Sequence, residues 1–259
     1  MSEWIDKVVI ITGAGSGIGA GIAIGFAQNG CNLALVGRNE KNLMETAEKC
    51  RNLGLPKDKI LCIIADLFID DDVKSIVTKT INKFGKIHVL VNNAGIPAIG
   101  GLPSIKIKVF DDIMHVNVRS AVLLSQEAVP YLIETKGNIV NISSAAAAQG
   151  YPKLVTYAMS KAALDHFTRC SAIDLAPKGV RINSIRPGLV DTPIFSLVGM
   201  DNEYKNKIMD TNKSKHPMGR LCTIKDISQT VCFLASDNSS FTTGQIIGID
   251  GSDPGSLIQ

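Results

Sequence analysis

The chain reads Thr12-Gly13-Ala14-Gly15-Ser16-Gly17-Ile18-Gly19 at the end of its first continuous apolar run, residues 8–12. The glycines allow a sharp turn and let backbone N–H groups approach a ligand closely. Residues 20–29 follow with a pattern that predicts a helix opening from this turn. The N-terminus of a helix carries partial positive charge, so such a turn suits a pyrophosphate. The sequence therefore predicts a nucleotide-binding turn, although the strict G-x-G-x-x-G spacing is not met.

The alternation of strand and helix continues along the chain. Further apolar runs of strand length occur at 32–36, 60–65, 87–92, 137–142, 180–185 and 245–249. Amphipathic segments of helical period lie between them, at 39–53, 70–84, 110–134, 156–176 and 224–235. This order predicts a single doubly wound, Rossmann-like α/β domain over residues 1–259, with a seven-stranded parallel sheet and helices on both faces. Residues 193–220 break the alternation, and we expect them to form a lid over the substrate.

Composition argues against several other classes of protein. The 259 residues carry a net charge of only +3, and the basic residues are spread evenly, so no nucleic-acid-binding face is expected. No apolar run approaches the roughly 20 residues that a membrane span needs, and the N-terminus lacks the layout of a signal peptide. The six cysteines form no C-x-x-C pair and the four histidines are far apart, so we expect reduced thiols and no metal site. We therefore predict a soluble, cytoplasmic protein that binds neither nucleic acid nor membrane.

The end of the second predicted strand bears on the identity of the nucleotide. NAD-binding folds place Asp or Glu there, where the carboxylate bonds the ribose hydroxyls. This chain instead reads Val36-Gly37-Arg38, and a guanidinium matches the geometry of a 2′-phosphate. We predict NADP(H), with Gly37 leaving room for the phosphate, and keep NAD(H) as the alternative.

Two further positions indicate acid–base chemistry. Tyr157 and Lys161 are four residues apart in a predicted helix and share one face. A neighbouring ammonium lowers the pKa of a phenol from about 10 towards neutral pH, which would let Tyr157 exchange protons. Ser143 and Ser144 follow the strand at 137–142, at the sheet edge where α/β folds bind ligands. A hydroxyl there would hold a substrate oxygen facing Tyr157, although singly these residues also suit an exposed helix pair and a turn.

The motifs together resemble the short-chain dehydrogenase/reductase family in its compact form, over essentially the whole chain. The resemblance rests on residues that occur in the family's order and spacing: the glycine turn, Asp66-Leu67, Asn92-Asn93-Ala94-Gly95, Asn117, Ser144, Tyr157, Lys161, Pro187-Gly188 and Thr192.

The resemblance implies a role for each matching residue. Tyr157 would donate or accept the proton at the carbonyl or alcohol oxygen, and Ser144, favoured over Ser143 by its spacing from the tyrosine, would orient that oxygen. Lys161 would lower the pKa of Tyr157 and bind the nicotinamide ribose, while Asn117 would hold a water in a proton relay. The implied cofactor-binding residues are Gly13, Ser16, Gly17, Ile18, Gly19, Arg38, Asp66, Asn93, Gly95, Tyr157, Lys161, Pro187, Gly188, Val190 and Thr192.

Two positions depart from the family pattern. Ser16 stands where many NADP(H)-using members carry a basic residue, which is why NAD(H) stays the alternative. Residues 219–224 read Gly-Arg-Leu-Cys-Thr-Ile instead of the usual Gly-Arg-x-Gly-x-Pro, so we expect the lid to be anchored differently.

The expected function is hydride transfer between NADP(H) and a hydrophobic ketone or secondary alcohol, of steroid, isoprenoid or xenobiotic type. The expected pocket walls are largely apolar: Ile96, Pro97, residues 145–151, Leu189, Ile194, Phe195, Leu197, Val198, Met200 and Met218. One alternative is a 3-ketoacyl-thioester reductase of fatty-acid synthesis, with Arg119, Arg169 and Lys178 as a basic surface for an acidic carrier protein. The other is a nucleotide-binding regulator without turnover, against which the intact catalytic residues argue. The family also implies a homotetramer.

Overall fold

All seven strands belong to one parallel sheet in the computed structural model, which describes residues 4–194 and 201–252. The strand order is β3-β2-β1-β4-β5-β6-β7. The strands are β1 (Val8–Thr12), β2 (Asn32–Gly37), β3 (Ile60–Ile64), β4 (Val89–Asn92), β5 (Asn138–Ile142), β6 (Arg181–Pro187) and β7 (Ile246–Ile249). The predicted doubly wound, seven-stranded parallel fold is confirmed.

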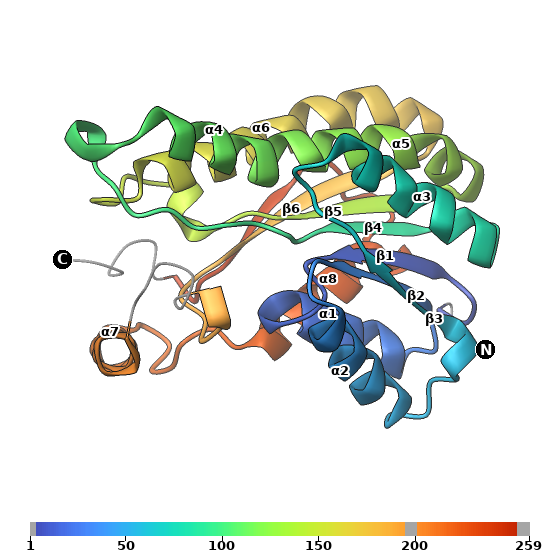
Figure 1. The fold of residues 1–259 in the computed structure, drawn as a ribbon, viewed down its shortest axis with the longest axis horizontal. Helices are drawn as coiled ribbons and strands as arrows, with labels where there is room; N and C mark the ends of the chain where they lie inside the picture. Colours follow the sequence, from blue (N-terminus) through green and yellow to red (C-terminus); the bar gives the residue numbers. More distant parts are fainter. Residues whose placement is uncertain (1–3, 195–200, 253–259) are drawn as a thin grey trace.

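Helices cover both faces of this sheet (Figure 1). One face carries α1 (Gly17–Gln28), α2 (Glu40–Arg51) and α8 (Ile224–Ala235). The other carries α3 (Asp70–Phe84), α4 (Ile107–Met114), α5 (Ser120–Thr135) and α6 (Val155–Leu175). Strand β1 shows how one apolar run serves both layers, because Val9 and Ile11 belong to one buried cluster and Ile10 to the other. A strand covered on both sides is therefore apolar throughout.

The helix predicted at 110–134 is divided into three elements. A π-helical turn, His115–Arg119, separates α4 from α5. The amphipathic pattern continues through this turn, so the pattern alone does not reveal it. Such turns are frequent at functional sites because they displace one residue from the regular helix. Here that segment contains the buried Asn117.

The ligand-binding edge of the sheet follows from the strand order. Strand β1 pairs with β2 on one side and β4 on the other, so the chain reverses its direction of winding there. Ligands of open α/β sheets bind outside the carboxyl ends of the strands at this switch point. The loops after β1, β2, β3 and β4 meet at this place.

The segment 193–220, predicted as a lid, contains the helix α7 (Asn202–Lys215). In Figure 1 this helix lies apart from both helical layers, at the lower left of the view. Phe195, Leu197, Val198 and Met200, which we expected in the pocket wall, lie outside the described residues.

Neither a membrane-spanning helix nor a cluster of metal ligands occurs in the described part of the chain. None of its helices is long and apolar enough to cross a membrane. In residues 4–194 and 201–252, no group of three or more His, Cys, Asp or Glu side chains is arranged to hold a metal ion.

Candidate active site

A cleft of about 520 Å³ runs along the carboxyl edge of the sheet. The glycine turn and Arg38 lie in its wall, and so do Tyr157 and Lys161. The predicted cofactor residues in its lining are Gly13, Ser16, Gly17, Ile18, Gly19, Arg38, Asp66, Asn93, Gly95, Tyr157, Lys161 and Thr192. One cleft thus joins the predicted nucleotide-binding turn to the predicted catalytic pair.

The turn after β1 requires glycine for two separate reasons. Gly13 and Gly17 have φ angles of +66° and +51°, in the left-handed region that side chains rarely adopt. At residue 19 there is no room for a side chain, because a Cβ atom there would lie 2.2 Å from the carbonyl oxygen of Gly13 and 2.5 Å from Nδ2 of Asn93. The first turn of α1 can therefore pack against the loop after β4 only without a side chain at residue 19.

Thr12 and Asn93 fasten this turn to the neighbouring strand β4. The Thr12 hydroxyl accepts hydrogen bonds from the backbone N–H groups of Asn93 and Ala94, both at 3.0 Å. The Asn93 amide donates to the Thr12 carbonyl oxygen at 2.8 Å. Asn93 therefore lines the cleft, and its side-chain amide holds the backbone of the glycine turn in place.

The glycine end of the cleft fits the diphosphate of a dinucleotide. Ser16 is the N-cap of α1, yet its side chain makes no capping hydrogen bond, and the first helical turn contains no acidic residue. The N–H groups of that turn are therefore available to an anion. Arg38 is exposed at the same cleft, and it makes no hydrogen bond or ion pair with residues 4–194 or 201–252. These groups would hold the phosphates of the cofactor.

Ser144, Tyr157 and Lys161 meet at the other end. Ser144 follows β5 and shares a hydrogen bond with the Tyr157 hydroxyl. The Lys161 Nζ atom lies 5.9 Å from the centroid of the Tyr157 ring and donates to the carbonyl oxygen of Ile142 at 2.8 Å. The Ser143 hydroxyl donates to the carbonyl oxygen of Lys161 at 3.2 Å, and Ser143 also lines the cleft. The choice of Ser144 over Ser143 as the catalytic residue stays a prediction.

The predicted lowering of the Tyr157 pKa is wrong. Burial raises the pKa of Tyr157 above its ordinary value, and the hydrogen bond with Ser144 opposes this rise only in part. The Lys161 amine is itself buried, which lowers the Lys161 pKa to about 8. Burial therefore disfavours both the phenolate form of Tyr157 and the ammonium form of Lys161.

Asn117 acts as a connection within the site. Its side-chain oxygen accepts from the Ile96 N–H at 2.8 Å, and its amide donates to the Ile96 carbonyl and the Ser160 hydroxyl, both at 3.0 Å. A Cβ atom on Gly95 would lie 3.2 Å from Oδ1 of Asn117 and 3.3 Å from Nζ of Lys161. Asn117 therefore sits beside Lys161. Both amide protons of Asn117 are taken up by these hydrogen bonds. A water held by Asn117 would therefore have to donate to the side-chain or the backbone carbonyl oxygen of Asn117.

Comparison with known proteins identifies the family. The profile of the family described as enoyl-(acyl carrier protein) reductase matches residues 13–251. A 3-oxoacyl-[acyl-carrier-protein] reductase of Thermotoga maritima is 37% identical over 246 residues, which are 95% of this chain and 96% of that protein. The chain belongs to the short-chain dehydrogenase/reductase family.

Other members of the short-chain dehydrogenase/reductase family differ in substrate. An L-xylulose reductase of Caenorhabditis elegans is 34% identical, covering 96% of each chain. A short-chain dehydrogenase/reductase from Caenorhabditis elegans, solved with its cofactor, superposes with a TM-score of 0.92 at 36% identity, covering 99% of this chain and 97% of that one. The first of these is named as a reductase and the second as a short-chain dehydrogenase/reductase of unknown function, and this chain is an oxidoreductase of the same family.

Three residues that the resemblance implied for cofactor binding, Pro187, Gly188 and Val190, are not part of the cleft wall. Val190 is buried in the core cluster beneath α1 and α8. Pro187 ends β6 and is buried, and the Gly188 N–H donates to the carbonyl oxygen of Ile249 at 3.0 Å. These residues shape the edge of the sheet beside the cleft, whereas Thr192, farther along the same loop, lines it.

Several cleft residues were not predicted from the sequence. Asn39 and Asn42 lie beside Arg38, and Asn39 is the N-cap of α2, accepting from the Asn42 N–H at 3.0 Å. Phe68 also lines the cleft, and its ring stacks on His115 of the π-helical turn at 5.4 Å between centroids. The N-cap pattern at Asn39 was a usable signal in the sequence, but nothing in the sequence paired Phe68 with His115.

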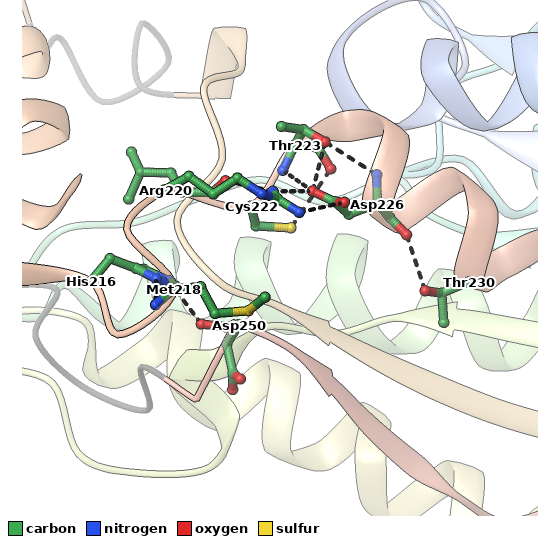
Figure 2. A network of polar contacts seen from close by, with 9 residues as sticks. His216, Met218, Arg220, Cys222, Thr223, Asp226, Thr230 and Asp250 are labelled. Carbon is green, nitrogen blue, oxygen red and sulfur yellow. Dashed lines mark hydrogen bonds and ion pairs between the residues drawn. The ribbon is translucent and has the colours of Figure 1, made fainter.

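A set of polar contacts holds the segment around residues 219–224, where the sequence departs from the family pattern (Figure 2). Arg220 forms a two-point contact with Asp226, at 2.7 and 3.0 Å, while Thr223 and Asp226 make a capping box at the start of α8. His216, which follows α7, binds the carbonyl oxygen of Asp250 at 3.0 Å through Nε2 and accepts from the Met218 N–H at 3.2 Å through Nδ1. The segment between α7 and α8 is thereby tied to the chain after β7.

Proposed function

We propose that the protein transfers a hydride between NADP(H) and the carbon of a hydrophobic ketone or secondary alcohol. The observation that carries the proposal is the single cleft that joins an uncapped helix N-terminus and Arg38 to Tyr157 and Lys161. The cofactor supplies the hydride when it is bound.

The catalytic residues would divide the proton chemistry among them. Ser144 would hydrogen-bond the substrate oxygen beside the Tyr157 hydroxyl, and Tyr157 would donate its proton to that oxygen in reduction or remove it in oxidation. Lys161 would hold the ribose hydroxyls and stabilise the phenolate after proton transfer. Asn117 would support the relay by fixing the backbone of Ile96 and the hydroxyl of Ser160 and by holding a water through a carbonyl oxygen.

The preference for NADP(H) rests on the end of β2. Gly37 and Arg38 occupy the position where an acidic residue would bond the ribose hydroxyls of NAD(H). A guanidinium with no other partner in the described chain is suited to a phosphate. Ser16 supplies no second positive charge, so NAD(H) is the competing cofactor.

The substrate proposal rests on the apolar residues at the catalytic end. Ile96, Val116 and Ile194 line the same cleft as Tyr157, whereas Ala145 and Ala146 are buried and do not line it. The competing substrate is a 3-ketoacyl thioester. The similarity to the Thermotoga maritima protein, which is named as a 3-oxoacyl-[acyl-carrier-protein] reductase, supports this alternative. We propose that residues 193–220 close over either substrate as a lid within the single domain.

The last part of the proposal concerns the oligomeric state and the cellular location. We propose a cytoplasmic homo-oligomer, a tetramer by analogy with the family. Val122 of α5 and Met159 and Ile173 of α6 are exposed apolar side chains on the helices that would pack between subunits. Light scattering on the purified protein measures the subunit number, and a monomeric mass would contradict this part of the proposal.

A substrate screen tests the proposed function. The purified enzyme is mixed with NADPH or NADH and with a steroid ketone, an aromatic ketone, acetoacetyl thioester or a ketose, and cofactor absorbance is followed. We expect the highest kcat/KM with NADPH and a hydrophobic ketone. Fastest turnover of the thioester would favour the fatty-acid reductase instead. Cofactor binding without turnover of any of these carbonyl classes would favour the non-catalytic regulator.

A further inference from the structure

Helix α6 carries a buried carboxylate that the proton transfer described above does not use. Asp165 lies one helical turn beyond Lys161, and its side chain is only 1% exposed. Its Oδ1 atom accepts from the Ser184 hydroxyl at 2.8 Å, and its Oδ2 atom accepts from Nε of Arg186 at 2.6 Å. Both of these partners belong to β6.

The ion pair connects two parts of the active site. Asp165 is on the helix that bears Tyr157 and Lys161, and Arg186 immediately precedes Pro187-Gly188 at the end of β6. Buried ion pairs usually add little net stability, because desolvation offsets the attraction between the charges. We therefore expect this ion pair to act mainly on the charge state of neighbouring ionisable groups.

The Lys161 amine lies one helical turn before Asp165 on α6, and both side chains are buried. Lys161 is buried, its Nζ atom donates to the Ile142 carbonyl, and it forms no ion pair within the described residues. Burial lowers the pKa of Lys161 to about 8, and the charge of Asp165 raises it against this effect. At neutral pH Asp165 therefore helps to decide whether the lysine is charged.

The other charged groups around Lys161 have their own partners or lie on other faces. The Arg119 side chain binds Asp70 at 2.6 Å, and Lys108 binds Asp112 at 2.9 Å. Strand β5 and residues 145–147 contain no ionisable side chain. The other ionisable groups on α6 and on the elements packed against it are Tyr157, Asp165, His166, Arg169, Cys170 and Asp174 of α6, Lys178 of the turn after it, Lys108, Asp111 and Asp112 of α4, His115 and Arg119 of the π-helical turn, and Arg181 and Arg186 of β6.

We infer that Asp165 is a positioning residue that keeps the Lys161 amine protonated, while Arg186 limits this effect by neutralising part of the carboxylate's charge. The inference rests on the proposed function, in which the protonated lysine holds the cofactor ribose and stabilises the phenolate of Tyr157. Ser184 orients the carboxylate without contributing charge.

Two substitutions separate this electrostatic role from a structural one. Asp165→Asn and Arg186→Gln both break the same ion pair, so a purely structural role predicts similar effects. The electrostatic role predicts opposite effects. Asp165→Asn removes the stabilising charge and leaves Arg186 unpaired, so the alkaline limb of the pH profile of kcat/KM should move down by about one pH unit.

Arg186→Gln should move the same limb upwards, because Asp165 then acts on Lys161 without its counterion. We expect this shift to be smaller, since the Arg186 side chain is 21% exposed and its charge is partly screened by water. Ser184→Ala, which removes a hydrogen bond and no charge, should leave the limb in place. Shifts in one direction for both charge variants, or no shift in either, would overturn the inference.

A titration of Lys161 makes the test independent of turnover. Isotope-labelled lysine is followed by NMR as the pH is raised, with the Lys161 signal assigned by its loss in Lys161→Arg. The expected midpoints rank Arg186→Gln above wild type and wild type above Asp165→Asn. If the wild-type protein turns over no carbonyl, the proposed function fails, yet this ranking still supports or contradicts the role of Asp165. If Asp165→Asn does not fold, an unchanged or lowered midpoint in Arg186→Gln is sufficient to contradict it.

Discussion

The two ends of the cleft are built in different ways. At the glycine end, which we propose for the nucleotide and call the nucleotide end, the shape comes from backbone conformation within one short stretch. Gly13 and Gly17 have positive φ there, and Gly19 contacts Gly13. At the catalytic end, the shape comes from side chains that are far apart in sequence. Asn117 reaches back 21 residues to Ile96 and forward 43 residues to Ser160. A local motif sets the first end, whereas tertiary contacts set the second.

This difference predicts how each end responds to substitution. A backbone turn tolerates no added atom at its contact points, because neighbouring backbone cannot move away cheaply. A network of side chains loses individual hydrogen bonds, each of which has a smaller cost. The largest effects on stability should therefore come from the turn.

The largest of these predicted effects is for Gly19→Ala. The added Cβ atom would lie 2.2 Å from the Gly13 carbonyl oxygen, so the turn must open. We expect a loss of about 3 kcal/mol in the free energy of unfolding, together with weaker binding of NADPH. Urea denaturation measures the first and fluorescence titration the second. Gly150→Ala is the matched control, because a Cβ atom there meets nothing within 4 Å. Equal stability of the two variants would show that the turn is not closely packed.

Asn117→Ala tests the catalytic end. The substitution leaves the Ile96 N–H and the Ile96 carbonyl without their partner and removes one of the two hydrogen bonds of the Ser160 hydroxyl, so we expect a loss of about 2 kcal/mol. The turnover number should fall as well, because Asn117 lies beside Lys161. Asn29→Ala, which removes one local hydrogen bond from the Asn29 amide to Gly25, is the control. If Asn117→Ala changed stability no more than the control, the network would not support the site.

Arg38→Leu tests the choice of cofactor at the nucleotide end. Loss of a charge-assisted contact with a 2′-phosphate should lower kcat/KM for NADPH by about 10- to 100-fold and leave the value for NADH nearly unchanged. The single substitution is cleaner than one that includes Gly37→Asp, because a Cβ atom at Gly37 would lie 3.3 Å from Leu43. Arg169→Leu, at an exposed position on α6 away from the cleft, is the control. An unchanged ratio of the two kcat/KM values would contradict the assignment of Arg38.

The smallest predicted effect is for Arg220→Ala at the lid anchor. The Arg220 guanidinium beside Asp226 holds the pKa of that carboxyl below its usual range. A lowered carboxyl pKa stabilises the fold above the ordinary pKa of aspartate, and this contribution is lost as the pH falls through the folded-state value. At neutral pH the variant should therefore melt about 1–2 °C lower, because exposed ion pairs contribute little. The difference should shrink in strong acid. A difference in Tm that grew with acidification would contradict the assignment.

Sequence patterns were sufficient for the fold and for the position of the glycine turn. The buried run at β1 and the glycines after it are local features, and the observed strand lies at the predicted residues. The patterns could not predict the π-helical turn, since the helical period passes through it unchanged. They also missed the contact of Phe68 with His115 and the ion pair of Asp165 with Arg186, because both depend on how α6, β6 and the loops pack together.

The direction of the Tyr157 pKa illustrates the same limit. The spacing of Tyr157 and Lys161 predicted a shared helix face, and the structure places the two side chains close together. Spacing gave no measure of burial, which dominates the pKa of both groups. Charge proximity could be inferred from the sequence, but the cost of removing both groups from water could not.

The most direct measurement compares Tyr157→Phe with the wild-type enzyme, in turnover and in the Kd for NADPH. Phenylalanine keeps the ring and removes only the hydroxyl that would move the proton. We predict that kcat falls by about a hundred- to ten-thousand-fold, while the Kd for NADPH is essentially unchanged. Turnover close to that of the wild type would contradict the assignment of Tyr157 as the proton donor on which the account depends.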